Sequence, residues 1–304
     1  LGAGSSGSTI RGLIINRFGA SGIEINGSNN HTIQGNWIGL DATGTAAAAN
    51  NIKGIAVVNG SGNLIGGTTA ATRNVVSGNA QQGIFFDNAD SNTISGNYIG
   101  TNAAGTGDVS GTAANVQQTG VYLTSGSSGN TIGGTSAGAR NVISGNNWFG
   151  VEFLGSGTSG NLLQGNYIGT DATGQVALGN SQGGATSWNA ATNNTIGGGA
   201  SGAGNVISGN FGNGVQLAYG ATGFKVQGNL IGLAADGVTA LGNQYSGIYL
   251  YNGGSAALVS GNLIGSDGDG SNDANERNVI SGNGSGIVLE NAEVTANTVA
   301  GNYI

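Results

Sequence analysis

One seven-residue phrase, Arg-Asn-Val-Ile-Ser-Gly-Asn, occurs twice without change in this chain, at positions 140–146 and 277–283. Near copies of it begin at Arg73 and Gly204. A second phrase of the type Gly-Asn-x-Ile-Gly alternates with the first, starting at Gly35, Gly96, Gly165, Gly228 and Gly261. A repeat at steady spacing means that each unit packs on its neighbours instead of around one centre. The chain is therefore predicted to be a solenoid.

Three kinds of short strand recur in a fixed order along the chain. The first reads Gly-apolar-x-apolar, as at 120–123, and the second is of the Asn-Thr-Ile type, as at Asn130. The third reads Asn-x-Ile-Gly or Asn-Val-Ile-Ser, as at Asn97 and Asn141. Alternating β-branched residues bounded by Gly and Asn indicate strands, and helical spacing is absent. We expect an all-β, single-stranded parallel β-helix of about nine coils, each with three short strands.

Side chains alternate between the two faces of a strand, so the inner residues of the first strands should form one interior ladder. These residues are Ile23, Ile55, Ile84, Val121, Val151, Val215, Ile248 and Ile287. The Gly-Asn corners should stack a second ladder, made of side-chain amides. Its expected members are Asn36, Asn79, Asn97, Asn146, Asn166, Asn210, Asn229, Asn283 and Asn302. Because the repeat runs from end to end, residues 1–304 are interpreted as one β-helix domain, a fragment of a longer chain.

Composition excludes several classes of function. Of the 304 residues 64 are glycine, but 38% are hydrophobic and regularly placed, which indicates a packed interior. Lys and Arg total 7 against 14 Asp and Glu, so no basic patch exists for nucleic acid. Cysteine is absent, and no apolar run is long enough to insert into a membrane.

The phrases GNYIGTDATG, NTIGGTSAGARNVISGN and GVYL resemble repeats of the right-handed parallel β-helices found in large secreted and surface proteins of bacteria. The resemblance is to the pectate-lyase-like solenoid superfamily and covers essentially the whole chain. It implies an extracellular or cell-surface location in a bacterium. Relatives of this architecture include lyases, epimerases, tailspikes, adhesins and inert spacers, so the resemblance does not fix the function.

Three acidic residues are predicted to share the outward face of the first strands: Glu24, Asp87 and Glu152. Each should lie two coils from the next, about 10 Å at the sheet spacing. A retaining glycosidase needs its two carboxyl groups ~5 Å apart, and an inverting one ~6.5–9.5 Å apart. No Lys or Arg is expected on this face. The three acids are therefore interpreted as solvated surface, and as the catalytic candidates if the chain is an enzyme.

Aromatic residues are predicted on the same outward face. They are Phe85, Tyr122, Trp188, Tyr249 and Tyr251. Aromatic rings stack on sugar rings, and exposed apolar patches mark contact surfaces. These residues are therefore candidate ligands for a polysaccharide, with coverage by loops or by another copy as the alternative.

One loop near the C-terminus has oxygen-bearing side chains at alternate positions. Asp267, Asp269 and Asp273 are separated by glycine and small polar residues, and Glu276 follows. This order resembles the start of a calcium loop, although the glutamate of an EF-hand is missing from the twelfth position. Calcium is the one cofactor considered, with a plain polar turn as the alternative.

Catalytic triads are excluded because the single histidine, His31, stands where other coils have Asn or Ser. We expect His31 to have a corner or surface role. Arg73, Arg140 and Arg277 each precede the Asn-Val-Ile strand and are expected to anchor loops, since the fourth copy has Gly204 in their place.

The absence of a convergent polar cluster favours a non-catalytic extracellular rod, such as a stalk, an adhesin segment or a fibre subunit. Such a rod presents unpaired strand edges, so its expected partners are neighbouring repeats or copies of itself packed end to end. The alternative is a polysaccharide-active enzyme, namely a lyase, glycoside hydrolase or epimerase that works on the outward face of the first strands.

Overall fold

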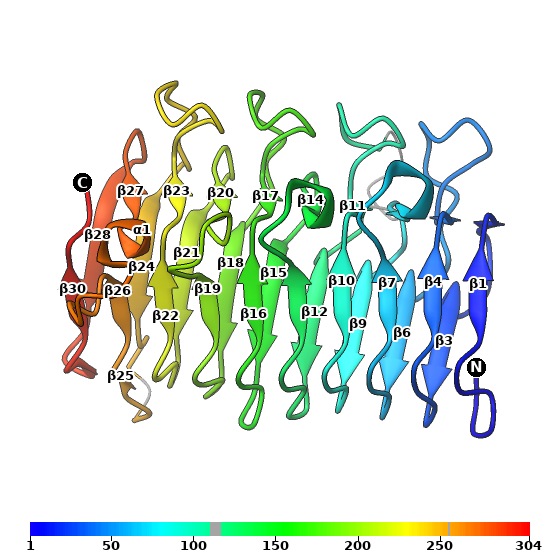
Figure 1. Ribbon diagram of the computed structural model, residues 1–304, viewed down its shortest axis with the longest axis horizontal. Helices are drawn as coiled ribbons and strands as arrows, with labels where there is room; N and C mark the ends of the chain where they lie inside the picture. Colours follow the sequence, from blue (N-terminus) through cyan, green and yellow to red (C-terminus); the bar gives the residue numbers. More distant parts are fainter. Residues whose placement is uncertain (110–116, 255) are drawn as a thin grey trace.

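Three parallel β-sheets run along a rod in the computed structural model, which describes residues 1–109, 117–254 and 256–304. Each coil contributes one short strand to each sheet, and the two termini lie at opposite ends of the rod (Figure 1). The predicted all-β parallel β-helix is confirmed. Helical segments among the described residues are short: η1 (Ala70–Thr72), η3 (Ala137–Ala139) and α1 (Asp273–Glu276).

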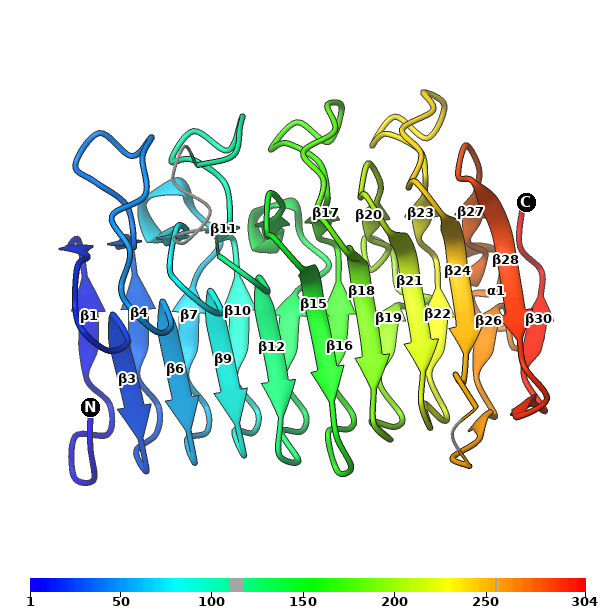
Figure 2. The same cartoon turned by 180° about the vertical axis from the view of Figure 1, so that it is seen from behind.

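The first sheet is built from the Gly-apolar-x-apolar phrases and faces the viewer in Figure 2. Its strands are β3 (Ile23–Asn26), β6 (Ile55–Val58), β9 (Ile84–Asp87), β12 (Val121–Thr124), β15 (Phe149–Leu154), β18 (Gly183–Trp188), β21 (Asn213–Ala218), β24 (Ser246–Tyr251) and β28 (Ser285–Glu290). Neighbouring strands pair in register, so equivalent residues of successive coils lie side by side.

The second sheet contains the Asn-Thr-Ile strands and lies behind the first in Figure 2. Its strands are β1 (Thr9–Arg11), β4 (Thr32–Gln34), β7 (Leu64–Gly66), β10 (Thr93–Ser95), β13 (Thr131–Gly133), β16 (Leu162–Gln164), β19 (Thr195–Gly197), β22 (Lys225–Gln227), β26 (Leu263–Gly265) and β30 (Thr298–Ala300). A separate pair, β25 (Val259–Ser260) and β29 (Val294–Thr295), lies near the C-terminus.

The third sheet contains the two-residue strands of the GNYIG and NVISGN phrases. They are β2 (Ile14–Ile15), β5 (Trp37–Ile38), β8 (Val75–Val76), β11 (Tyr98–Ile99), β14 (Val142–Ile143), β17 (Tyr167–Ile168), β20 (Val206–Ile207), β23 (Leu230–Ile231) and β27 (Val279–Ile280).

The interior ladder forms as the alternation of side chains predicts. Its residues are buried in one continuous core, with Ala185 of β18 completing the row and Ile287 partly buried at the last coil. Burial of apolar side chains along the whole bore is the main stabilising contribution to a solenoid, because each coil contacts only its neighbours.

The asparagines expected in a single ladder stack as well, but they fall into two separate ladders. One contains Asn36, Asn74, Asn97, Asn141, Asn166, Asn205, Asn229, Asn278 and Asn302. The other contains Asn50, Asn79, Gln117, Asn146, Asn180, Asn210, Asn243 and Asn283. The sequence misleads because Gly-Asn occurs both before the third sheet, as in GNYIG, and after it, as in NVISGN. Only the register separates the two corners.

His31 occupies an asparagine position at the third corner, where its backbone N–H donates to Asn63 of the next coil. The side chain is only 1% exposed, so the corner role is confirmed and the surface role is not. Its Nδ1 accepts a hydrogen bond from the Ser8 amide, and its Nε2 lies 2.9 Å from Ser28 Oγ. Burial lowers the pKa of His31, which favours a neutral ring.

Four hairpin loops stand along one edge of the rod (Figure 1), each closed by an antiparallel bridge. The bridges join Leu40 to Ala47, Thr101 to Asp108, Thr170 to Ala177, and Leu233 to Ala240. Successive loops are hydrogen-bonded to one another, from the amides of Ala103, Ala172 and Ala235 to the carbonyls of Gly44, Gly105 and Gly174. Ala172 and Ala235 of these loops pack on a small apolar cluster with Tyr98, Val142, Tyr167, Val206 and Leu230. The loops therefore cover outward side chains of the third sheet.

The three repeat arginines anchor this region. Their guanidinium groups lie over tyrosine rings of the next coil, Arg73 on Tyr98 at 4.0 Å, Arg140 on Tyr167 at 4.1 Å and Arg277 on Tyr303 at 5.5 Å. In the copy that has Gly204 instead of arginine, β20 pairs with β23. That strand has Leu230, without an aromatic ring, at the position of the tyrosines. Arginine and tyrosine thus occur together, as a cation–π contact requires.

The ends of the rod expose apolar side chains. Leu13, Ile14 and Phe18 are exposed beside β1–β3, and Leu289, Val299 and Tyr303 at the last coils. Packing of another repeat or copy on these ends stays a prediction. In the described part of the chain, no helix is both long and apolar enough to cross a membrane.

Candidate functional site

The outer face of the first sheet carries three rows of side chains. The central row contains Glu24, Ala56, Phe85, Tyr122, Glu152, Thr186, Gln216, Tyr249 and Val288, paired strand to strand. A second row follows two residues later and includes Asp87, Trp188, Tyr251 and Glu290. A further row, not expected from the sequence, lies three residues before the central row. Its members reach the central row directly, because Lys53 contacts Phe85, Thr119 contacts Glu152, and Asn213 contacts Gln216.

Glu152, in the middle of this face, is not the solvated acid that we expected. Its side chain points outward from β15, yet the residue is only 8% exposed. Its Oε2 accepts a long hydrogen bond of 3.4 Å from Thr119 Oγ1. Burial raises the pKa of Glu152 from 4.5 to about 7, opposed only in part by that hydrogen bond. The carboxyl group therefore holds a proton close to neutral pH.

Two aromatic rings explain how an outward carboxyl is kept from water. Phe149 stands near the start of β15 and Trp188 at the end of β18, so their backbones are far apart along the sheet. Their ring centroids are nevertheless 6.1 Å apart. The rings must therefore lean toward each other over the middle of the two strands, where Glu152 and Thr186 lie side by side. Thr186 is 0% exposed, which agrees with this cover.

Polar atoms without partners gather at the same place. Thr186 Oγ1 and Trp188 Nε1 are buried and make no hydrogen bond, and the same holds for Gln82 Oε1, two residues before β9. An unpaired buried polar atom costs about 1–3 kcal/mol, so native proteins keep few of them away from functional sites. Thr186 lies opposite Glu152 and Trp188 two residues further along β18, so both atoms would gain partners from a hydroxyl group bound there.

The predicted aromatic ligands fall into two groups on either side of Glu152. Phe85 and Tyr122 stack with centroids 5.6 Å apart, and Tyr249 and Tyr251 stack at 5.3 Å. Trp188 joins the second group through Tyr219, which stacks on it at 5.1 Å and meets Tyr251 edge-on. Much of each ring face already contacts another ring, so less free face is available for sugars than we expected. Sugar binding by these residues stays a prediction.

The three candidate acids are not brought together. Glu24 is exposed on β3, Asp87 is half-buried on β9, and one strand lies between each acid and the next in the sheet. Asp87 and Glu152 lie two strands and two residues apart, roughly 12 Å between Cα atoms at standard sheet dimensions. Glu152 is hydrogen-bonded to Thr119, which precedes β12, whereas Asp87 stands at the other end of the strands, on the last residue of β9. A retaining pair of carboxyl groups ~5 Å apart is therefore absent from these three residues.

Lys53 corrects the expectation that no cation shares this face. Its Nζ lies 3.8 Å from the centroid of the Phe85 ring, on the side away from Tyr122. The sequence pattern missed Lys53, Thr119 and Phe149 for one reason. Each directly precedes the glycine of the first-strand phrase, so strict alternation counted from the strand does not include it. They can be found in the sequence by taking the residue directly before the glycine of each first-strand phrase.

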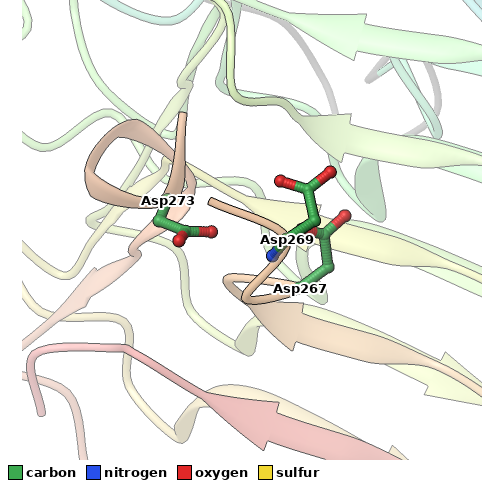
Figure 3. Close-up of side chains that lie close together, drawn as sticks. All are labelled: Asp267, Asp269 and Asp273. Carbon is green, nitrogen blue, oxygen red and sulfur yellow. The ribbon is translucent and has the colours of Figure 1, made fainter. Parts of the chain in front are cut away.

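The predicted calcium loop forms a compact turn between β26 and α1 (Figure 3). Carboxylate oxygens of Asp267, Asp269 and Asp273 lie within 4.8 Å of one another. Glu276 does not join them, because its Oε2 accepts a hydrogen bond from the Asp267 amide. Asp267 also forms an ion pair of 3.6 Å with Lys225. Carboxylate oxygens suit calcium, and a calcium ion at this turn stays a prediction.

Comparison with known proteins gives the fold and little more. No family model matches this sequence, and no curated protein matches it. A variant of the periplasmic alginate epimerase AlgG aligns with a TM-score of 0.54 and 14% identity, over 94% of this chain and 60% of its own. Another structure of AlgG aligns with a TM-score of 0.51 and 15% identity, over 93% of this chain and 60% of its own. The A-module of the mannuronan C-5 epimerase AlgE6 from Azotobacter vinelandii aligns with a TM-score of 0.44 and 16% identity, over 98% of this chain and 78% of its own.

These comparisons define the class as parallel β-helix proteins, and this chain spans about 60% of the length of AlgG. They also correct the functional interpretation. The sequence favoured a non-catalytic rod on the ground that no polar cluster was visible. The two structures of AlgG are named as an alginate epimerase, and the outer face of the first sheet holds a buried carboxyl group. The alternative interpretation, a polysaccharide-active enzyme, is the better supported one.

Proposed function

We propose that this protein is a polysaccharide-active enzyme that hydrolyses glycosidic bonds on the outer face of its first sheet, with Glu152 as the general acid. The observation that carries this proposal is the buried, outward-facing carboxyl of Glu152, whose pKa is raised to about 7. A general acid is most effective when its pKa lies near the working pH. Raised carboxyl pKa values in apolar surroundings are typical of glycosidase acids.

The chemistry follows from the position of the proton. The proton of Glu152 passes to the glycosidic oxygen as the bond from that oxygen to the sugar carbon breaks. A water oxygen then bonds to the carbon, and the proton released from the water returns to the carboxylate. Thr119 Oγ1 positions Glu152 through its hydrogen bond. Thr186 Oγ1 and Trp188 Nε1 are free to bind sugar hydroxyl groups beside it.

Access to Glu152 requires a movement of the aromatic cover. The rings of Phe149 and Trp188, whose centroids are 6.1 Å apart, restrict access to the carboxyl in this proposal, so a sugar reaches it when Trp188 turns away from Phe149. Trp188 then offers a ring face to the sugar, and its stacking on Tyr219 guides it back after release. This closure also keeps water from the carboxyl before binding, which maintains the raised pKa.

The test is a comparison of two matched variants. Wild-type protein is assayed for new reducing ends on a panel of polysaccharides, beside Glu152→Gln and Glu24→Gln. Glu152→Gln keeps the shape of the side chain and removes its proton, so activity should fall by about 100-fold or more. Glu24 is an exposed acid of the same row and should tolerate the change. Full activity in Glu152→Gln, or no hydrolysis of any polysaccharide, would refute the proposal.

Two further points belong to the same proposal. We place the protein among the pectate-lyase-like solenoids, secreted or displayed at a bacterial surface, because the repeat phrases resemble theirs. We also keep end-to-end packing as a proposal, supported by the apolar side chains exposed at both ends of the rod.

A further inference from the structure

We infer that the polysaccharide is uncharged: the acidic outer face of the first sheet, with Lys53 as its single cation among the residues described, fits a neutral glycan and repels a polyuronate. The inference rests on the proposed function and names the substrate class of the same site. It separates this site from those of the alginate epimerases that share its fold, since alginate is an acidic polymer.

The distribution of positive charge carries the first step. The sequence contains seven basic residues, and all lie in the described part of the chain. Three of them are held over tyrosine rings beside the third sheet, namely Arg73, Arg140 and Arg277. Arg11 and Lys225 belong to strands of the second sheet, and Arg17 lies in the connection after β2. Only Lys53 remains for the face that holds Glu152.

Lys53 is poorly placed to serve the reacting centre. Its ammonium group lies over the ring of Phe85, which already holds it by a cation–π contact. It precedes β6, which is three strands from β15 in the first sheet, a separation of roughly 14 Å at the sheet spacing. Tyr122, on β12, lies between Phe85 and Glu152. A carboxylate on a sugar bound at Glu152 would therefore find no cation within bonding reach.

Negative charge dominates the same face. Glu24, Asp87 and Glu290 all project from it beside the protonated Glu152, and Glu290 accepts a hydrogen bond from the hydroxyl of Tyr249. A polyuronate carries a carboxylate on every sugar, so each bound sugar would add a like charge to this surface. Like-charge juxtaposition is a common means of excluding a wrong partner.

The reaction imposes the same requirement. A lyase or an epimerase removes the proton next to a uronate carboxylate, and the negative charge that develops must be stabilised by a cation or strong donors. The neighbours of Glu152 across the strands are Tyr122 and Thr186, both uncharged. Hydroxyl and amide groups such as Thr119, Thr186 and Gln216 instead match the hydroxyl groups of a neutral sugar.

The experiment measures binding, so it does not depend on turnover. Affinity electrophoresis compares soluble neutral glucans and galactans with polygalacturonate and alginate, at about 20 mM and about 200 mM salt to vary the screening length. A neutral glycan should bind with little dependence on salt. The polyuronates should bind at least about tenfold more weakly at the lower salt, with the gap narrowing as salt screens the repulsion.

Two variants with the same change of net charge test the cause. Asp87→Asn removes one charge from the face and should reduce the difference in binding affinity between neutral and acidic glycans, which is the gap described above. Asp108→Asn removes one exposed charge from a hairpin over the third sheet and should leave the gap unchanged.

The outcomes separate the two proposals. Preferential binding or processing of a polyuronate would overturn the present inference and leave a polysaccharide-active enzyme in place. Failure to bind or process any glycan of either kind would overturn both. A gap that does not respond to salt or to Asp87→Asn would overturn the electrostatic argument on which the inference depends.

Discussion

Tyr122 and Glu152 lie directly opposite each other on neighbouring strands of the first sheet, and the phenol is held in its neutral form beside the carboxyl group. Burial, with smaller contributions from the charges of Glu152 and Asp87, raises the pKa of Tyr122 to about 12. A neutral phenol next to a carboxyl with a pKa near 7 gives this surface two proton donors at neutral pH. The pair therefore defines the polar centre of an otherwise aromatic face.

The raised pKa of Glu152 predicts how stability depends on pH. The folded chain binds this proton more tightly than the unfolded chain, whose carboxyl keeps its ordinary pKa of 4.5. The contribution to stability is thus full below about pH 4.5 and is lost as pH rises toward 7. Glu152→Gln has no carboxyl proton to lose. Its free energy of unfolding above pH 7 should therefore exceed that of wild type, by up to roughly 3 kcal/mol.

Chemical denaturation across this pH range provides the measurement. Glu24→Gln is the matched control, since it makes the same change at an exposed glutamate of the same row. An identical pH slope in wild type and Glu152→Gln would mean that the carboxyl titrates as in water.

The arginine–tyrosine contacts predict a measurable coupling. Arg140→Ala removes a cation over the Tyr167 ring and the hydrogen bond from Nε to the Gly165 carbonyl, 3.2 Å long. We expect a loss of about 1–2 kcal/mol from the free energy of unfolding. A double-mutant cycle with Tyr167→Leu should give a coupling of about 0.5–1 kcal/mol. Strictly additive effects would show that the ring does not stabilise the guanidinium group.

The asparagine ladders predict a larger effect. Asn97 accepts hydrogen bonds from the amide and side chain of Asn74 and donates to Asn141, all buried. Asn97→Ala leaves these partners unsatisfied and should cost about 2–4 kcal/mol of unfolding free energy. Asn51→Ala, at an exposed asparagine, should change stability by less than about 0.5 kcal/mol. Comparable costs at the two positions, measured by denaturant titration, would contradict a structural role for the ladder.

Calcium titration tests the turn formed by Asp267, Asp269 and Asp273. Binding should release heat in isothermal titration and raise the melting temperature by a few degrees, since a ligand of the folded state stabilises it by mass action. Asp269→Asn removes one candidate oxygen donor and should weaken both signals, whereas Asp108→Asn should not. No heat and no thermal shift would identify the turn as a purely hydrogen-bonded one.

The sequence predicts the scaffold better than the site, for a physical reason. The coil and its interior ladder depend on neighbours fixed by the repeat, so the row from Ile23 to Ile287 is readable from spacing alone. The two asparagine ladders could not be told apart from the sequence, because the dipeptide Gly-Asn occurs both before and after the strands of the third sheet. The burial of Glu152 depends on Phe149 and Trp188, which come from different coils and lean toward each other. Such a contact depends on the positions of side chains from different coils, which the alternation of residues along a strand does not reveal.

The cation on the outer face of the first sheet could not be predicted from the sequence for a similar reason. Lys53 stands three residues before the central row, outside the period-two pattern, and only its contact with Phe85 places it on the face. The predicted acids were located correctly on their strands, but their spacing said nothing about which of them water reaches. Solvation separates Glu152 from Glu24, and it is set by aromatic neighbours.

The most direct test of the account is the titration of Glu152 itself. Carbon-13 NMR of protein labelled at the glutamate side-chain carboxyl groups, assigned by comparison with Glu152→Gln, follows its protonation with pH. We predict a midpoint near 7, well above the ordinary carboxyl value of 4.5. A midpoint near 4.5 would contradict it, because Glu152 would then be an ordinary solvated acid without a proton to donate at neutral pH.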